Sequence, residues 1–432
     1  MELSARLQHE LTQLGGAALV HALRHACDAL GKAAAATPDT SADGVSTEWQ
    51  RVEQFAVEAY KRSWEKLHCG AWKSITSAWR EAFAHAGVLR RRGALLECMK
   101  ILDMCLMMAG PYALSQTHEL IAQVEAQLLE SHSAKPTSDP AQVHGDETNG
   151  YLQHQERPAK RAKTTESVVE EHEQDLRFPV RRLQFPSLQD FRQHALLQNE
   201  PVIITGAMEH WPALGRADPS RAWRDLSYFR RVAGWRTVPI EIGSSYLEDD
   251  WKQELMTVNE FIDRYIELSD VPGNRGDDHD RGIGYLAQHH LFEQIPVLGR
   301  DIMTPDYCVL RRSEEDEDEE DIAINAWFGP QGTVSPLHFD PKDNLLCQAV
   351  GAKYLRLYAP TESEKLYPVE GLLSNTSQVQ MDDPDFDQFP KFRDAKYTEC
   401  VLKEGEMLFI PPRYWHFVKS LNTSFSVSFW WS

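Results

Sequence analysis

The sequence predicts an α+β protein in which an all-α region precedes a β-rich region. Through residues 1–130, apolar residues recur at three- and four-residue steps, which is the period of an amphipathic helix. Through residues 176–432, short β-branched and aromatic runs alternate with Pro and Gly turns, which is typical of strands. Residues 131–175 show neither pattern. The chain therefore divides into a helical N-terminal domain, a linker and a β-rich C-terminal domain.

The N-terminal region is expected to form a helical bundle or a stack of helical hairpins. Apolar stripes with helical spacing run over residues 3–14, 52–64, 72–83, 95–106 and 120–128. Four tryptophans lie in or beside these stripes, namely Trp49, Trp64, Trp72 and Trp79. They suit either a peptide-binding groove or a core, and burial preferences favour the core.

The linker is rich in Pro, Ser, Thr, His, Gln and Glu, a composition typical of disordered segments. It holds one compact basic cluster, Pro158–Lys163, which is a candidate nuclear-import signal. A chance run of solvated charge explains the cluster equally well. We expect a nuclear protein that also occurs in the cytoplasm.

Composition narrows the class of protein. The net charge of -20 over 432 residues argues against a direct nucleic-acid binder. The chain has neither a basic and apolar leader nor an apolar stretch of about 18 residues, so we expect an intracellular protein without a membrane span. Seven Cys without a Cys-x-x-Cys pair predict reduced thiols, and neither a disulfide framework nor a thiolate zinc site.

The most informative stretch is His338-Phe339-Asp340, read together with His416. Residues two apart on a strand project to the same face, so His338 and Asp340 can share one metal ion. Most His-x-Asp pairs carry no function, and the pattern alone is weak. A second histidine, His416, would complete a two-His, one-carboxylate face that leaves three coordination positions open, as iron(II) requires to activate oxygen.

The neighbouring strands strengthen this interpretation. Lys353 shares a strand face with Leu355 and Leu357, and a buried Lys is costly unless an anion meets it, so the candidate partner is a carboxylate cosubstrate. The last strand, 424–431, has one bulky apolar face and one serine-rich face, which leaves room for a ligand inside a barrel. Ser335 lies three residues from His338 and reaches the site only if Pro336 bends the chain.

Five stretches in this region resemble the JmjC-domain (cupin-like) iron(II) and 2-oxoglutarate oxygenases. They are Asn325–Pro330, Ser335–His338, Lys353–Tyr358, Tyr414–His416 and Ser424–Trp431. The resemblance covers residues 176–432 and implies a double-stranded β-helix, or jelly-roll, catalytic domain.

The resemblance also implies roles for single residues. His338, Asp340 and His416 would ligate Fe(II), and Lys353 would pair with the distal carboxylate of 2-oxoglutarate, with O2 as the co-oxidant. Further cosubstrate contacts are expected from Tyr307, Ser335, Asn344 and Trp327.

For the substrate, the resemblance suggests C-3 hydroxylation of arginine in a protein or peptide. Glu241 suits a bidentate guanidinium and Trp251 suits stacking on it. The alternatives without a role in substrate binding are that Glu241 forms a surface ion pair and that Trp251 packs at the rim of the site. The acidic run Ser313–Asp321 suits attraction of basic substrates, but it is more simply a solvated loop.

Three other functions stay open. Demethylation of a methylated histone tail is the first, although the chain has no Cys-rich zinc reader module. A histone-tail peptidase is the second, although the sequence has no His-Glu-x-x-His pattern. A non-catalytic binding scaffold is the third, and it is disfavoured because all three ligands and Lys353 are present. The sequence does not specify the oligomeric state.

Overall fold

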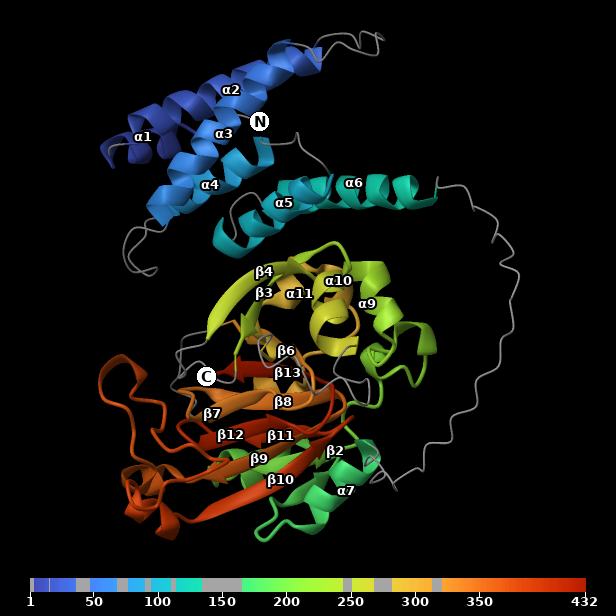
Figure 1. Ribbon diagram of the computed structural model, residues 1–432, viewed down its shortest axis with the longest axis vertical. Helices are drawn as coiled ribbons and strands as arrows, with labels where there is room; N and C mark the ends of the chain where they lie inside the picture. Colours follow the sequence, from blue (N-terminus) through green and yellow to red (C-terminus); the bar gives the residue numbers. More distant parts are fainter. Residues whose placement is uncertain are drawn as a thin grey trace, which may run out of the picture. The chain divides into compact units, whose positions relative to one another are not determined.

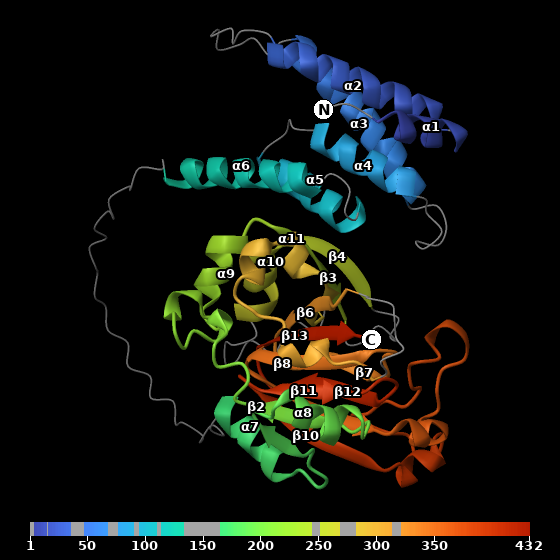
Figure 2. The same cartoon turned by 180° about the vertical axis from the view of Figure 1, so that it is seen from behind.

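The computed structural model describes residues 4–14, 16–35, 47–67, 77–89, 95–109, 114–133, 165–243, 251–267, 282–312 and 321–432. The chain divides into two compact units. The first comprises Met1–Gln155 with Trp235–Thr237, and the second comprises Glu156–Gly234 with Val238–Ser432. Ribbon views from opposite sides are given in Figures 1 and 2.

The first unit contains six helices within the described residues. They are α1 (Ala5–Gln13), α2 (Ala17–Ala35), α3 (Thr47–Leu67), α4 (Ser77–Leu89), α5 (Leu95–Ala109) and α6 (Leu114–Ser133). Leu7, Leu11 and Phe83 are fully buried in the cluster that α1 to α5 share, because the apolar stripes face one another.

Two of the four tryptophans bear out the core interpretation. Trp79 is buried, and Trp64 packs against the same cluster. The side chain of Trp49, and the whole of Trp72, lie outside what the structure describes.

The second unit contains thirteen strands in its described part. They are β1 (Arg182–Gln184), β2 (Val202–Thr205), β3 (Thr237–Ile242), β4 (Lys252–Thr257), β5 (Gly284–His289), β6 (Ala323–Gly329), β7 (Val334–His338), β8 (Asp343–Val350), β9 (Ala352–Tyr358), β10 (Tyr397–Lys403), β11 (Met407–Ile410), β12 (Trp415–Ser420) and β13 (Ser424–Trp431).

Short helices connect and flank these strands. The α-helices are α7 (Thr165–Gln174), α8 (Leu188–Phe191), α9 (Leu226–Ala233), α10 (Val258–Phe261), α11 (Leu291–Gln294) and α12 (Pro296–Gly299). Helices α8 and α10 continue as π-helical turns, η2 (Arg192–Leu196) and η5 (Ile262–Ile266). The 3-10 turns are η3 (Pro212–Leu214), η4 (Pro219–Arg221), η7 (Asp306–Val309), η8 (Pro360–Leu366), η9 (Gly371–Leu373) and η10 (Pro390–Asp394).

Helix α7 corrects the linker predicted for residues 131–175. The last residues of that range form a helix whose Val169 packs against Ala352, Val401 and Leu421. Lys403 Nζ also lies 2.6 Å from a Glu173 carboxylate oxygen. The polar composition of the segment hid this helix, whose contacts with the β-rich region also include the His172 ring against Tyr354. The basic cluster Pro158–Lys163 lies outside the described residues.

The strands form two sheets. The nine-stranded sheet has the order β1-β2-β11-β8-β13-β6-β5-β3-β4, and the four-stranded sheet has the order β10-β9-β12-β7. Strands distant in sequence alternate within each sheet, as in β8 between β11 and β13, and the described pairs are antiparallel except β1 with β2. This two-sheet sandwich after a helical region confirms the predicted fold class.

The two faces of β13 explain how the sheets are filled. Phe425, Val427 and Phe429 enter the core on one side, where Trp223 and Phe229 pack. The intervening serines face the other sheet. A smaller cluster between the sheets joins Leu346, Leu408 and Ile410 to Leu355, Leu357 and Val418. The space between the sheets is therefore apolar at one end and polar at the other.

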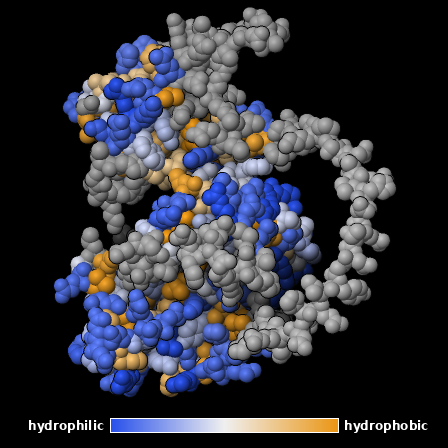
Figure 3. Space-filling model, in the orientation of Figure 1, coloured by the Kyte–Doolittle hydropathy of each residue, from blue (hydrophilic) through white to orange (hydrophobic). Residues whose placement is uncertain are grey.

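Figures 1 and 2 show where the helices cover this sandwich. Helices α9, α10 and α11 lie at the end of the large sheet that holds β3 and β4, whereas α7 lies beside β10. Hydrophilic residues predominate on the face of the second unit shown in Figure 3, with small hydrophobic patches between them. None of the helices in the described ranges is both long and apolar enough to cross a membrane.

A glycine fixes the hairpin that carries Lys353 into the sandwich. Gly351 joins β8 to β9 with a φ of +73°, and a Cβ there would lie 2.2 Å from the Thr423 carbonyl oxygen. Both the left-handed backbone and the close approach therefore require glycine.

Asp301 is the hub of a buried polar cluster beside the core. It is fully buried and accepts hydrogen bonds from Arg221 Nε (2.7 Å), Trp223 Nε1 (3.0 Å) and the Tyr228 hydroxyl (2.5 Å). Burial, together with the bond to Asp301, raises the pKa of Tyr228 to about 12, so this hydroxyl remains a donor.

We predict that Asp301→Asn lowers the free energy of unfolding by about 2 kcal/mol, because the substitution removes a buried charge that three donors share. Urea denaturation followed by tryptophan fluorescence measures the change. The control is Asp306→Asn, at an exposed position nearby, which should leave the unfolding curve unchanged. Equal stability of the two variants would contradict the prediction.

Candidate active site

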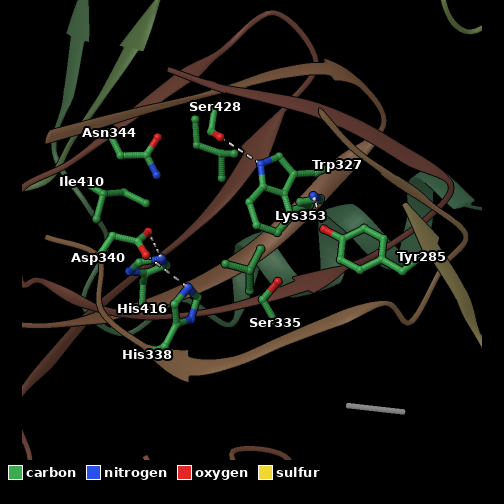
Figure 4. A pocket seen from close by; sticks show the side chains of 12 residues that line it. Tyr285, Trp327, Ser335, His338, Asp340, Asn344, Lys353, Ile410, His416 and Ser428 are labelled. Atoms are coloured by element: carbon green, nitrogen blue, oxygen red, sulfur yellow. Dashed lines mark hydrogen bonds and ion pairs between the residues drawn. The ribbon is translucent and has the colours of Figure 1, made fainter. Parts of the chain in front are cut away.

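The pairing of β7 with β12 places two histidines side by side. His338 is the register partner of His416, and Asp340 follows two residues after His338. His338 Nε2 lies 4.0 Å from Asp340 Oδ1, and His416 Nε2 lies 3.6 Å from Asp340 Oδ2. One ligand atom from each residue lies within 4.8 Å of the others. In Figure 4 the three side chains converge at one end of the cavity.

Backbone carbonyls fix the tautomers of both histidines. His338 Nδ1 lies 2.7 Å from the Pro336 carbonyl oxygen, and His416 Nδ1 lies 3.0 Å from that of Tyr414. A ring nitrogen facing a carbonyl must carry the proton, which leaves each Nε2 lone pair facing Asp340. Burial, and next the proximity of His338, lower the pKa of His416 to about 4, so its ring is neutral at physiological pH.

The three residues therefore fit a divalent metal ion. They offer two imidazoles and one carboxylate on one side, with space on the other, which is the donor set of non-haem iron(II) sites. The cavity beyond them is lined by side chains from eight strands of the two sheets. Besides the three ligands, the lining consists of Tyr285, Trp327, Ser335, Asn344, Leu346, Lys353, Ile410, Val418 and Ser428.

Lys353 lies at the far side of this cavity from the ligands (Figure 4). It is 2% exposed, and its Nζ lies 3.2 Å from the Tyr285 hydroxyl. No carboxylate pairs with it among the residues that the structure describes. Burial lowers the pKa of Lys353 to about 7, because the charged form loses its hydration. A carboxylate of a bound ligand would restore the charge.

Two further residues complete the polar wall. The Asn344 side-chain oxygen is buried without a hydrogen-bond partner in the described structure. Trp327 Nε1 donates to the Ser428 hydroxyl at 2.9 Å, which holds its ring over the cavity. A dicarboxylate such as 2-oxoglutarate would thus meet the buried Lys353 cation and the Tyr285 hydroxyl, whereas the Asn344 oxygen can only accept a hydrogen bond from a donor.

Ser335 reaches the cavity because the β7–β12 register shifts. His338 pairs with His416, but Ser335 pairs with Val418. The two pairs are therefore three residues apart on β7 and two residues apart on β12. This bulge includes Pro336 and Leu337, and it turns Ser335 to the same side as His338. The condition set by the sequence, a bend at Pro336, is met.

The structure corrects the expectation for Tyr307. Its hydroxyl donates to the Pro186 carbonyl oxygen at 2.8 Å, and its ring packs on Phe191, away from the cavity lining. Tyr285 takes the expected place beside Lys353. Burial raises the pKa of Tyr285, so its hydroxyl stays protonated. No sequence motif marks Tyr285, and a local pattern could not have shown that its strand, β5, lies next to β6.

Glu241 and Trp251, the predicted substrate contacts, lie together beside the cavity. Trp251 Nε1 lies 3.4 Å from Glu241 Oε2, and Glu241 is the register partner of Tyr285. Burial raises the pKa of Glu241, whereas the Trp251 hydrogen bond acts in the opposite direction. Neither residue lines the cavity itself. The acidic run of residues 313–320 lies outside the described residues.

Comparison with known proteins supports this description of both units. A family model described as a cupin-like domain matches residues 188–432. A second model, described as KDM8-like N-terminal ARM repeats, matches residues 44–138.

Three similar proteins extend over both regions. The chain is 40% identical over 403 residues to lysine-specific demethylase 8 of Xenopus tropicalis, covering 86% of each chain. It is 41% identical to the protein of the same name from Danio rerio, covering 86% of this chain and 85% of the relative. It is 38% identical to lysine-specific demethylase JMJ30 of Arabidopsis thaliana, covering 88% and 86%.

We predict that Tyr285→Phe weakens binding of 2-oxoglutarate roughly tenfold, because a charge-assisted hydrogen-bond partner beside Lys353 is lost. Calorimetric titration of the metal-loaded protein measures the dissociation constant. The matched control is Tyr307→Phe, which removes the same hydroxyl elsewhere and should leave the constant unchanged. Weaker binding in Tyr307→Phe together with unchanged binding in Tyr285→Phe would show that Tyr307 is the cosubstrate contact.

Binding of 2-oxoglutarate is expected to weaken as pH rises above about 7. The pKa of Lys353 is about 7 in the free cavity, and a bound carboxylate raises it, so binding takes up a proton above that pH. Affinity is therefore highest when Lys353 is already protonated, and it falls by up to roughly tenfold per pH unit above this range. Calorimetry in buffers of different ionisation enthalpy counts the protons.

Lys353→Arg is the control for this pH dependence. Arginine keeps its charge at all these pH values, so the slope and the proton uptake should vanish even if binding is weaker overall. An unchanged slope in this variant would assign the titration to another group.

Proposed function

Since this chain belongs to the JmjC (cupin-like) family of 2-oxoglutarate-dependent oxygenases, we propose that it binds Fe(II) and oxidises a cationic side chain of a protein substrate. The observation that carries the proposal is one cavity with a two-His, one-carboxylate cluster at one end and, at the other, a buried Lys that has no carboxylate partner among the described residues. The two ends suit a metal and an anionic cosubstrate, respectively.

The residues have separate roles in this proposal. His338, Asp340 and His416 hold iron, while Lys353 and Tyr285 bind the distal carboxylate of 2-oxoglutarate. Ser335 and Asn344 offer it further hydrogen bonds, and Trp327 forms an apolar wall. When bound, iron and 2-oxoglutarate supply the oxidation of a substrate C–H bond by O2, with succinate and carbon dioxide as co-products. The protein contributes orientation and exclusion of water.

The first candidate substrate is an N-methylated lysine, as in a histone tail. The support comes from the names of the relatives, which are lysine-specific demethylases. Oxidation of an N-methyl carbon gives a hydroxymethyl amine, which releases formaldehyde and leaves lysine one methyl group shorter. The same oxidation at an unactivated carbon stops at the alcohol, so the C–H bond presented to the site decides the product.

The second candidate is C-3 hydroxylation of arginine, favoured by Glu241 and Trp251. Glu241 has no cationic partner within the described ranges, and its burial makes an unpaired charge costly. A guanidinium matches a carboxylate with two parallel hydrogen bonds, whereas a dimethylated ammonium has one N–H to donate. Trp251 is 38% exposed and offers a ring for cation–π contact.

In this proposal the first unit would bind the substrate protein or another protein partner. Its match to ARM repeats indicates stacked helices, which in such proteins form extended surfaces for binding. A histone substrate would place the protein in the nucleus, with the cytoplasm as a further location. Histone-tail cleavage and a purely scaffolding role have no separate support in the cavity, whose donor set suits oxidation.

We expect that the protein, supplied with iron, ascorbate and 2-oxoglutarate, removes a methylene unit from methyl-lysine peptides, as mass spectrometry would detect. Gain of one oxygen on an arginine peptide would instead establish the second candidate. In either case Asp340→Ala should abolish the product. If neither peptide changes while the protein still binds both, the scaffold reading replaces the proposal.

Glu241→Gln separates the two candidates further, because it removes the charge facing the substrate and keeps the shape. Arginine hydroxylation should then fall by roughly tenfold or more, since a charged hydrogen bond pair is lost. The control is Glu254→Gln, on the neighbouring strand, where the carboxylate pairs with Lys252 near the surface.

A further inference from the structure

The carboxylate of Asp340 lies beyond the strand that presents it. Strand β7 ends at His338, and the β7–β12 pairing ends with His338 and His416. The two peptide groups that flank the Asp340 Cα therefore take no part in the hydrogen-bonded pairing of β7 with β12. Contacts outside this strand pair must restrain the backbone of Asp340, because the backbone determines the direction in which the carboxylate points. Figure 4 shows the carboxylate beside the two histidines.

The first restraint comes from the insert between β9 and β10, residues 359–396. Within it, Asn375–Ser377 runs antiparallel to the outer edge of β7, with Thr376 opposite His338. Ser377 N–H donates to the Leu337 carbonyl oxygen at 2.8 Å, and Phe339 N–H donates to that of Asn375 at 2.9 Å. The insert thus acts as a short additional strand that reaches Phe339 and no further.

At this point the Asn375 side chain extends the pairing by one bond. Its Nδ2 donates to the Phe339 carbonyl oxygen at 3.1 Å. Asn375 therefore holds both backbone groups of Phe339, one through its own carbonyl and the other through its amide. The second bond restrains the peptide plane between Phe339 and Asp340, which is one of the two planes whose orientations set the backbone angles of Asp340.

The second restraint acts on the other side of Asp340. Arg413 N–H donates to the Asp340 carbonyl oxygen at 2.7 Å. Arg413 has a φ of +60°, a conformation that non-glycine residues rarely adopt, and its guanidinium lies 4.9 Å from the Phe339 ring centroid. Phe339 in turn packs edge-on against Trp415. The peptide groups before and after Asp340 are each held by one hydrogen bond.

We propose that Asn375 is a positioning residue for the metal ligand Asp340, and that the insert thereby sets the affinity of the site for its metal. The inference rests on the proposed metal site and adds a residue that does not line the cavity. Residues that orient metal ligands without touching the metal typically change metal affinity by about tenfold or more when they are replaced.

The test is the affinity of the full-length protein for Mn(II), with free Mn(II) measured by electron paramagnetic resonance. Asn375→Ala should weaken binding about tenfold. Asn375→Asp should weaken it further, because a carboxylate would face the Phe339 carbonyl oxygen. The thermal unfolding midpoint of each metal-free variant should stay close to that of the metal-free wild type. This result would distinguish a misoriented Asp340 carboxylate from a destabilised fold.

Gln378→Ala is the matched control. Gln378 lies in the same insert, and its Nε2 also donates to a backbone carbonyl oxygen, that of Pro368, at 3.0 Å. This variant loses the same kind of bond away from Asp340 and should bind Mn(II) as the wild type does.

Two results would overturn the role of Asn375. One is an unchanged Mn(II) affinity in Asn375→Ala, and the other is an equal loss in Gln378→Ala, which would indicate a general effect of the insert. A wild type that fails to bind Mn(II), or an Asp340→Ala variant that still binds it, would instead overturn the metal site. The failure of the inference is thus distinguishable from that of its premise.

Discussion

The register of β7 against β12 is the constraint on which the site depends. His338 faces His416 across this pair, and both imidazoles reach Asp340 only in that register. A slip of one residue would turn Phe417 inward and His416 outward, because side chains alternate between faces. The bulge at Pro336 and Leu337 lets one strand offer both a ligand, His338, and a polar contact, Ser335. The metal-ligand end of the cavity and the neighbouring Ser335 therefore follow from a single pairing.

Lys353 imposes the second constraint, which is electrostatic. A fully buried ammonium without an anion is unfavourable, and no carboxylate of the described residues pairs with Lys353, so burial lowers its pKa to about 7. A carboxylate from the chain would stabilise the fold and occupy the position that the cosubstrate needs. The Asn344 oxygen also lacks a partner among the described residues, but as an acceptor it needs a donor and not a carboxylate. What the cavity lacks and a dicarboxylate supplies is an anion for Lys353.

Local patterns predicted the parts of this site that lie on regular strands. The alternation of side chains along a strand predicted that Lys353 shares the inner face of β9 with Leu355, and that Ser428 lies on the face of β13 opposite its apolar residues. Such predictions hold because side chains alternate between the two faces of a strand in any β-sandwich. Tyr285 was missed because the neighbours of β5 are decided by sheet order, which no local pattern encodes. Asn375 was missed for a similar reason, since it belongs to an insert without periodicity and acts through backbone groups. Helix α7 was hidden by its polar composition.

The charges around Tyr285 suggest how one site can sort two ligands of opposite sign. The Tyr285 hydroxyl contacts buried Lys353, and the paired position on β3 carries Glu241, which does not line the cavity. Burial keeps Tyr285 protonated, so a neutral group separates the cation from the carboxylate. An anion is therefore favoured deep in the cavity and a cation at its edge. Tyr285 and Glu241 lie on neighbouring strands of the large sheet, whereas Lys353 lies on β9 of the small sheet, so the spacing of the two charges depends on how the two sheets pack against each other.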